Sequence, residues 1–237
     1  MAIELVEPNE TEVNATGEIV KSFEWPGLPA DFFSTLIDIG ANIIIILVIA
    51  VIARKCLKLK LARTAGHAFY FIVGVVICAS EALILEQALL HMAFGLISVV
   101  IACLGVGAQI MYKQRKSRGT PRHFRSNHSI FGLAACILLL ATCVTGMYMI
   151  CRTNYWEPEV PIVHRVCGLL SFILLMTALV FAFNTGFMHC NWEQRSITCF
   201  KCWILLATFL TSTTQLLAII NDSIQLMPPS WMKHSQN

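Results

Sequence analysis

Six long apolar stretches dominate this chain and restrict it to a small set of folds. They cover approximately residues 34–53, 66–86, 90–112, 129–150, 162–183 and 200–220. A helix that crosses the hydrocarbon core of a bilayer needs roughly 20 consecutive apolar residues. Each stretch is continuously apolar and lacks the alternation of a membrane β-barrel strand. The sequence therefore predicts an all-α integral membrane protein with six transmembrane helices, which passes through the membrane several times.

Polar segments flank this apolar region at both ends of the chain. Residues 1–33 are acidic and lack the basic start and apolar centre of a cleavable signal peptide. We therefore expect the first apolar stretch to be retained as a helix. We divide the chain into a polar N-terminal arm (1–33), a six-helix membrane domain (34–221) and a C-terminal tail (222–237). The sequence does not indicate which cellular membrane holds the domain.

Four of the seven histidines stand at the start of an apolar stretch: His67 in the second, His91 in the third, His128 in the fourth and His164 in the fifth. Ionisable groups are costly inside a membrane and usually face the bundle interior or a functional cavity. Helices joined by short loops run antiparallel, so His67 and His128 should lie near one membrane face, here named side A. His91 and His164 should lie near the other face, side B. The sequence thus predicts two histidine pairs within a four-helix core formed by helices two to five.

A glycine follows three of these histidines four residues later, and these glycines are Gly95, Gly132 and Gly168. Residues at i and i+4 share one face of a helix, and a glycine there leaves room for a broad, flat group. His67 departs from the pattern, because Phe71 occupies its i+4 position. Haem is a large, flat ligand that histidines hold through its iron, and helix bundles bind such cofactors in their cores. The pattern predicts two b-type haems, ligated by His67 with His128 and by His91 with His164, and packed against the three glycines.

These residues resemble the cytochrome b561 family of transmembrane di-haem reductases, in particular its shorter "domain-containing" members, over about residues 64–185. The resemblance is carried by the four spaced histidines and by EAL at 81–83, ACLGVG at 102–107, HFRSNH at 123–128 and VHRVCG at 163–168. It implies the same histidine pairing and electron transfer across the membrane through two haems. It also implies ascorbate as electron donor, and monodehydroascorbate or a ferric chelate as acceptor. The other expected partner is the lipid bilayer, and we expect no nucleic-acid partner. Whether the chain forms a homodimer stays open.

The segment between the second and third helices departs from the family pattern. It reads LILEQALLHM and contains no Lys or Arg, whereas the family usually has a basic loop there that helps to hold ascorbate. The candidate anion-binding residues lie elsewhere: Arg152 and Arg165 on side B, and Arg118, Arg122 and Arg125 on side A. The basic residues of side A can instead be topogenic. By the positive-inside rule they place side A in the cytosol and both termini outside, which reverses the orientation usual in the family.

Two other classes of function fit parts of the pattern. A transporter of metal cations or protons can use histidines as relay groups, but it normally adds carboxylates within the membrane. The apolar stretches contain or border only three, namely Asp38, Glu81 and Glu86. A structural membrane protein that keeps the fold without haem is the other alternative. An optical spectrum of the purified protein separates both from the haem reductase.

Overall fold

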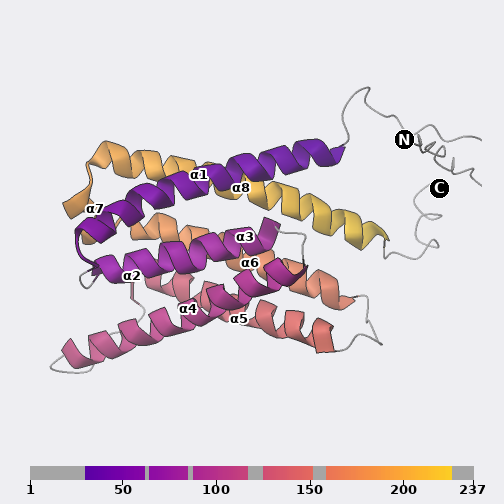
Figure 1. The fold of residues 1–237 in the computed structure, drawn as a ribbon, viewed down its shortest axis with the longest axis horizontal. Helices are drawn as coiled ribbons and strands as arrows, with labels where there is room; N and C mark the ends of the chain where they lie inside the picture. Colours follow the sequence, from indigo (N-terminus) through magenta and orange to yellow (C-terminus); the bar gives the residue numbers. More distant parts are fainter. Residues whose placement is uncertain (1–29, 62–63, 85–87, 117–124, 152–158, 226–237) are drawn as a thin grey trace, which may run out of the picture.

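The structure is a computed structural model that describes residues 30–61, 64–84, 88–116, 125–151 and 159–225. Within these ranges every regular element is a helix (Figure 1). Six helical segments are long and apolar enough to cross a membrane: Phe32–Lys58, Thr64–Ile84, Ala88–Arg115, Asn127–Cys151, Val160–Ala182 and Gln194–Ile224. The predicted fold class is confirmed: the protein is an all-helical, multi-pass membrane protein with six spans.

The helices follow one another in the order of the apolar stretches. They are α1 (Ala30–Lys58), α2 (Thr64–Tyr70), the π-helix η1 (Phe71–Ile77), α3 (Cys78–Ile84), α4 (Ala88–Lys116), α5 (Asn127–Cys151), α6 (Glu159–Ala182), α7 (Gly186–Asn191) and α8 (Gln194–Gln225). The second span is the continuous run of α2, η1 and α3. The short helix α7 joins α6 to α8 on side A, at the left of Figure 1.

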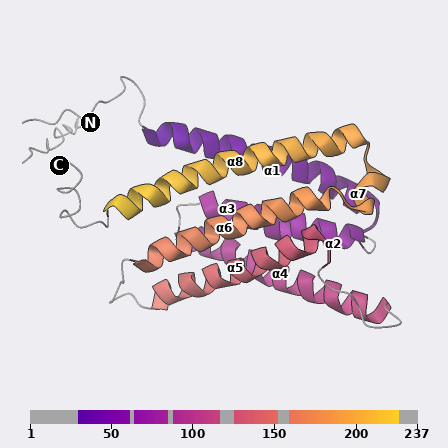
Figure 2. The same cartoon turned by 180° about the vertical axis from the view of Figure 1, so that it is seen from behind.

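Successive spans run antiparallel and pack into one bundle. Helices α1 and α8 lie side by side along one edge of the bundle, and α4 and α5 lie at the opposite edge, as Figures 1 and 2 both show. Helix α5 packs along α6, and α6 also contacts α8. The second span contacts α1, α4 and α6. The four histidine-bearing spans therefore form one body, and α1 and α8 cover it on one side.

The membrane domain extends slightly beyond the apolar stretches at both ends. Helix α1 begins at Ala30, before the predicted start at residue 34, and α8 continues to Gln225, past the predicted end at residue 221. Helical hydrogen bonding does not require apolar side chains, so Asp31 and Asp222 continue the helices at the ends of the spans. The division into arm, membrane domain and tail remains a prediction, because most of the arm and tail lies outside the described residues.

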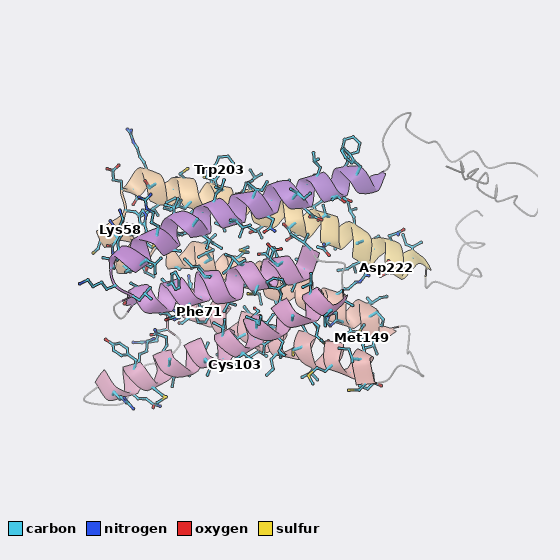
Figure 3. All side chains as sticks on the ribbon, viewed as in Figure 1. Lys58, Phe71, Cys103, Met149, Trp203 and Asp222 are labelled. Carbon is cyan, nitrogen blue, oxygen red and sulfur yellow. The ribbon has the colours of Figure 1, made fainter. Side chains whose placement is uncertain are left out.

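The outer surface of the bundle is apolar, as a lipid-facing surface must be. Leu47 of α1, Leu104 of α4 and Phe209 of α8 are 61%, 68% and 68% exposed. Figure 3 shows side chains projecting outwards along the helices, with Cys103 and Trp203 labelled on α4 and α8. The interior is closely packed around fully buried residues such as Ile45, Val75 and Phe172. The helices thus bury one face in the bundle and present another to the bilayer.

The π-helical segment η1 was not predicted by the sequence pattern. It brings the backbone of the second span close to α4 at Gly74, where an added Cβ atom would lie 2.5 Å from Ile101 Cδ1. Because periodicity reports only which residues are apolar, a widened turn within a continuous apolar stretch leaves no signal in it. π-Helical turns are rare and occur frequently at functional sites. Here the segment lies directly after the turn that carries His67.

Candidate functional site

Two histidine pairs lie inside the bundle, one toward each end. His67 of α2 faces His128 of α5 near side A, with ring centroids 6.4 Å apart and ring planes at 80°. His91 of α4 and His164 of α6 lie near side B, with centroids 5.8 Å apart and planes at 58°. All four side chains are partly buried. The structure thus brings together the residues that helix alternation predicts to pair.

The spacing within each pair fits two imidazoles on opposite sides of one metal ion. A metal–imidazole bond of roughly 2.0 Å, with about 1.1 Å more from nitrogen to ring centre, puts two opposed ring centroids about 6 Å apart. The observed centroid distances of 6.4 and 5.8 Å agree with this value. Two neutral imidazoles are a donor set that suits haem iron. The residues present therefore fit an axially ligated haem at each end.

Backbone carbonyl groups set the orientation of three of the four rings. The Nδ1 atom of His128 lies 2.9 Å from the carbonyl oxygen of Ala178. The Nδ1 atom of His164 lies 3.0 Å from that of Thr142, and the Nδ1 atom of His91 lies 2.5 Å from that of Ala82. A carbonyl oxygen can only accept, so Nδ1 carries the hydrogen and donates it. The Nε2 lone pair is then free to bind a metal, in the arrangement typical of metal-ligating histidine.

His67 has different surroundings: Phe71 occupies the i+4 position where the other three histidines have glycine, and a cavity lies beside the ring. Its ring lies 4.7 Å from that of Phe71, measured between centroids. Phe71 in turn packs over Gly105 of α4, where an added Cβ would lie 2.4 Å from Phe71 Cε2. A cavity of about 310 Å³ opens here between α2 and α4, lined by Thr64, Gly66, His67, Tyr70, Phe71, Gly105, Ala108, Gln109 and Tyr112. The side-A pair therefore borders open space that a flat cofactor could enter.

The sequence matches the family described as eukaryotic cytochrome b561 over residues 66–189, which is more than half of the chain. The chain belongs to this family. All four paired histidines fall inside the matched region, and the outer helices α1 and α8 fall outside it. Membership implies transmembrane electron transfer through haems. Comparison with curated proteins and with solved structures found no match.

The three predicted haem-packing glycines of this cytochrome b561 domain have different environments. Gly95 has no atom within 4 Å of an added Cβ and therefore borders open space. An added Cβ on Gly132 would contact Ala178 at 3.9 Å, and one on Gly168 would contact Thr142 at 3.6 Å. Both distances are ordinary van der Waals contacts, so the packing of α5 against α6 does not require glycine at either position. The two helices carry the carbonyl groups that orient His164 and His128. The packing of the three glycines against haem remains a prediction.

A glycine that the sequence pattern missed packs against the ring of His164. An added Cβ on Gly146 of α5 would lie 3.0 Å from His164 Cε1. Thr145 also reaches this ring, with Oγ1 3.2 Å from Nδ1. Gly146 lies 18 residues before His164 in the chain, so the His-x3-Gly spacing could not reveal it. Among the other polar side chains near the pairs, Tyr70 and Tyr112 line the side-A cavity, and Ser129 is hydrogen-bonded to Ser126 at the start of α5.

Of the five candidate anion-binding arginines, the structure describes two. Arg165 forms an ion pair with Asp222 of α8 on side B. Arg125 is exposed just before α5 on side A. Arg118, Arg122 and Arg152 lie outside the described residues. The structure therefore places one candidate in an ion pair and one on the surface.

The carboxylates that a transporter would need are bonded to neutral groups and not to histidine. Thr214 Oγ1 donates to Asp38 Oδ1 at 2.6 Å, and Asn42 Nδ2 donates to Glu81 Oε1 at 2.6 Å. Glu86 lies outside the described residues. No group of three or more His, Cys, Asp or Glu side chains gathers in the part of the chain that the structure describes. The histidines are arranged in pairs, as an axially ligated haem requires.

Proposed function

We propose that this protein passes electrons across the membrane through two b-type haems, one held by His67 and His128 and the other by His91 and His164. The observation that carries the proposal is the pair of imidazole contacts at metal-bridging distance. The hydrogen bonds from Nδ1 to backbone carbonyls leave Nε2 free in three of the four rings. Membership of the cytochrome b561 family supports the same assignment.

The bound haems would supply one-electron chemistry, and the chain supplies the route. From His91 to Tyr112 helix α4 rises about 31 Å, at 1.5 Å per residue. Haems set in from both ends would therefore lie within the span of one helix. The middle of the bundle is filled by buried apolar residues, among them Val75, Ala135 and Phe172. This packing excludes water from the space between the two pairs and holds the four histidine-bearing spans at fixed positions.

The proposed electron donor is ascorbate, and the proposed acceptor is monodehydroascorbate or a ferric chelate. Both acceptors and the donor are anionic, so basic side chains near a haem edge would raise their local concentration. On side B Arg165 already pairs with Asp222, and the segment before α4 contains no Lys or Arg. On side A Arg125 is exposed beside the start of α5. We therefore favour the side-A arginines Arg118, Arg122 and Arg125 as the anion-binding group, ahead of Arg152 and Arg165.

A haem assay tests the proposal most directly. The purified full chain should contain close to two haems per polypeptide in a pyridine haemochrome assay. Its reduced spectrum should show sharp bands, and carbon monoxide should bind slowly or not at all, because two histidines would hold each haem iron and leave no free coordination site. A haem content near zero in correctly folded protein would contradict the proposal and leave the haem-less structural alternative.

A further inference from the structure

A carboxylate inside the membrane lies next to the backbone group that holds His91. Glu81 of α3 directly precedes Ala82, whose carbonyl oxygen lies 2.5 Å from His91 Nδ1. The Glu81 carboxylate accepts a 2.6 Å hydrogen bond from Asn42 Nδ2 of α1. Glu81 therefore lies beside the side-B histidine pair, and its hydrogen-bond partner is a neutral amide.

The surroundings of Glu81 offer little positive charge to balance an ionised carboxylate. The elements packed against α3 are α1, η1, α4 and α6. Their titratable or charged side chains at this end, among the described residues, are Asp38, His91, His164, Arg165 and Cys167, and α3 itself adds Cys78. Arg165 is already paired with Asp222. A charge inside a membrane is costly without a partner, so a haem at the side-B pair would be the main source of compensating charge.

The charge of that haem depends on its oxidation state. Apart from the propionates, whose charge is the same in both states, an iron–porphyrin centre held by two neutral imidazoles would carry one positive charge when ferric and none when ferrous. In a medium of low dielectric constant such a charge acts strongly on a neighbouring carboxylate. The ferric state therefore stabilises an ionised Glu81. Reduction removes this stabilisation and favours the protonated carboxyl.

Asn42 is arranged to accept the protonated form as well. Its Oδ1 atom is buried and has no hydrogen-bond partner among the described residues. An ionised carboxylate offers only acceptors, whereas a protonated one also has an O–H donor. A protonated Glu81 can donate to Asn42 Oδ1 while it accepts from Nδ2, which completes a cyclic carboxyl–amide pair. The unsatisfied amide oxygen is thus the group that proton uptake would satisfy.

We propose that Glu81 is a proton-binding residue coupled to the haem held by His91 and His164. Glu81 would bind one proton from water on side B for each electron that a haem held there accepts, and its carboxylate would become a carboxylic acid. When the electron leaves, the O–H bond breaks and the proton returns to side B. The proposal rests on the proposed function, because it requires a haem at the His91–His164 pair.

Redox titration of the full chain at several pH values tests this coupling. The side-B component is identified as the one that His91→Ala removes. Because the reduced state binds the proton more tightly, its midpoint potential should fall as pH rises. The largest slope for one electron and one proton is ~59 mV per tenfold change in proton concentration. Glu81→Gln can make the same two bonds to Asn42 as a protonated carboxyl, so its potential should stay at the low-pH value of the wild type throughout.

Asp38→Asn is the matched control, because Asp38 is another intramembrane carboxyl bonded to a neutral donor, Thr214. Asp38→Asn should keep the wild-type slope of the side-B midpoint potential against pH. If Glu81→Gln fails to fold, Glu81→Asp serves instead, and its side-B midpoint potential should still depend on pH. The reduced-minus-oxidised infrared spectrum should contain a carboxylic-acid C=O band that Glu81→Gln abolishes. A flat wild-type side-B potential, or an unchanged slope in Glu81→Gln, would overturn the inference while leaving a two-haem protein intact. Absence of haem from the wild type would instead overturn the proposed function.

Discussion

At the scale of single residues, the site consists of four imidazoles, three of which are oriented by backbone carbonyl groups. Alternation of helix direction predicts that His67 pairs with His128 and His91 with His164, and the rings lie 6.4 and 5.8 Å apart in those combinations. We therefore expect His67→Ala and His128→Ala each to lose the same haem. His91→Ala and His164→Ala should each lose the other. Each single variant should retain about half of the wild-type haem, measured by haemochrome assay and by difference spectra.

His123 provides the control for this set, because it lies just before α5 but opens no apolar stretch. It is outside the described residues, and His123→Ala should retain both haems. If His67→Ala and His91→Ala depleted the same spectral component, the assignment of the two pairs would be wrong.

Part of this residue-level arrangement was beyond the reach of the sequence. The identity of the four histidines follows from their positions at the mouths of apolar stretches. The groups that orient them do not, because the carbonyl oxygens of Ala82, Thr142 and Ala178 belong to the backbone and carry no residue signature. The bond between Asn42 and Glu81 joins residues 39 positions apart, so it emerges only once α1 is packed against the second span.

At the scale of elements, the six spans were predictable because their length and apolarity are imposed by the bilayer. The π-helix η1 was not, because a widened turn within a continuously apolar stretch leaves no signal in the sequence. Within η1 the backbone at Gly74 approaches Ile101 of α4. The short helix α7 was also missed. It contains a single buried residue, Met188, and six residues are too few to show periodicity.

Gly74→Ala tests whether this close approach holds the second span in place. An added Cβ would lie 2.5 Å from Cδ1 and 2.9 Å from Cγ2 of Ile101, and a β-branched side chain in a helix has little rotamer freedom to move away. We expect the free energy of unfolding to fall by about 1–3 kcal/mol, as overpacking usually costs. Loss of haem absorbance on heating in detergent measures this as a lower midpoint temperature.

Gly40→Ala is the matched substitution, because no atom lies within 4 Å of an added Cβ on that residue of α1. It should leave the midpoint unchanged or raise it, since alanine favours a helix over glycine by up to ~1 kcal/mol. Equal midpoint temperatures for Gly74→Ala and Gly40→Ala would show that η1 and α4 can move apart at this contact without loss of stability.

At the scale of the whole molecule, basic charge is concentrated at one end. Side A carries basic residues at the end of α1, at the end of α4 and before α5, and these include Arg54, Lys55, Lys58, Lys60, Lys113, Arg115 and Arg125. On side B the described arginine, Arg165, is paired with Asp222. From this asymmetry the positive-inside rule predicts that side A faces the cytosol. The N-terminal arm, outside the described residues, contains the N-glycosylation motifs Asn9-Glu-Thr and Asn14-Ala-Thr. Glycosylation at either asparagine would support this orientation.

The same charge asymmetry predicts that the proposed anionic substrates bind at side A, attracted by its arginines. Neutralising Arg118, Arg122 and Arg125 together should slow reduction or reoxidation of the haem held by His67 and His128. It should also flatten the dependence of that rate on ionic strength, because salt screens the attraction of exposed charges. The measurement uses sealed, oriented vesicles, with a tag on each terminus and protease access to verify orientation. If the arginines act only in membrane insertion, orientation should become mixed while the rate per correctly oriented molecule stays the same. A variant with normal orientation, normal haem content and an unaltered salt dependence of this rate would exclude a binding role for the three arginines. Arg152 and Arg165 would then be the candidates to test.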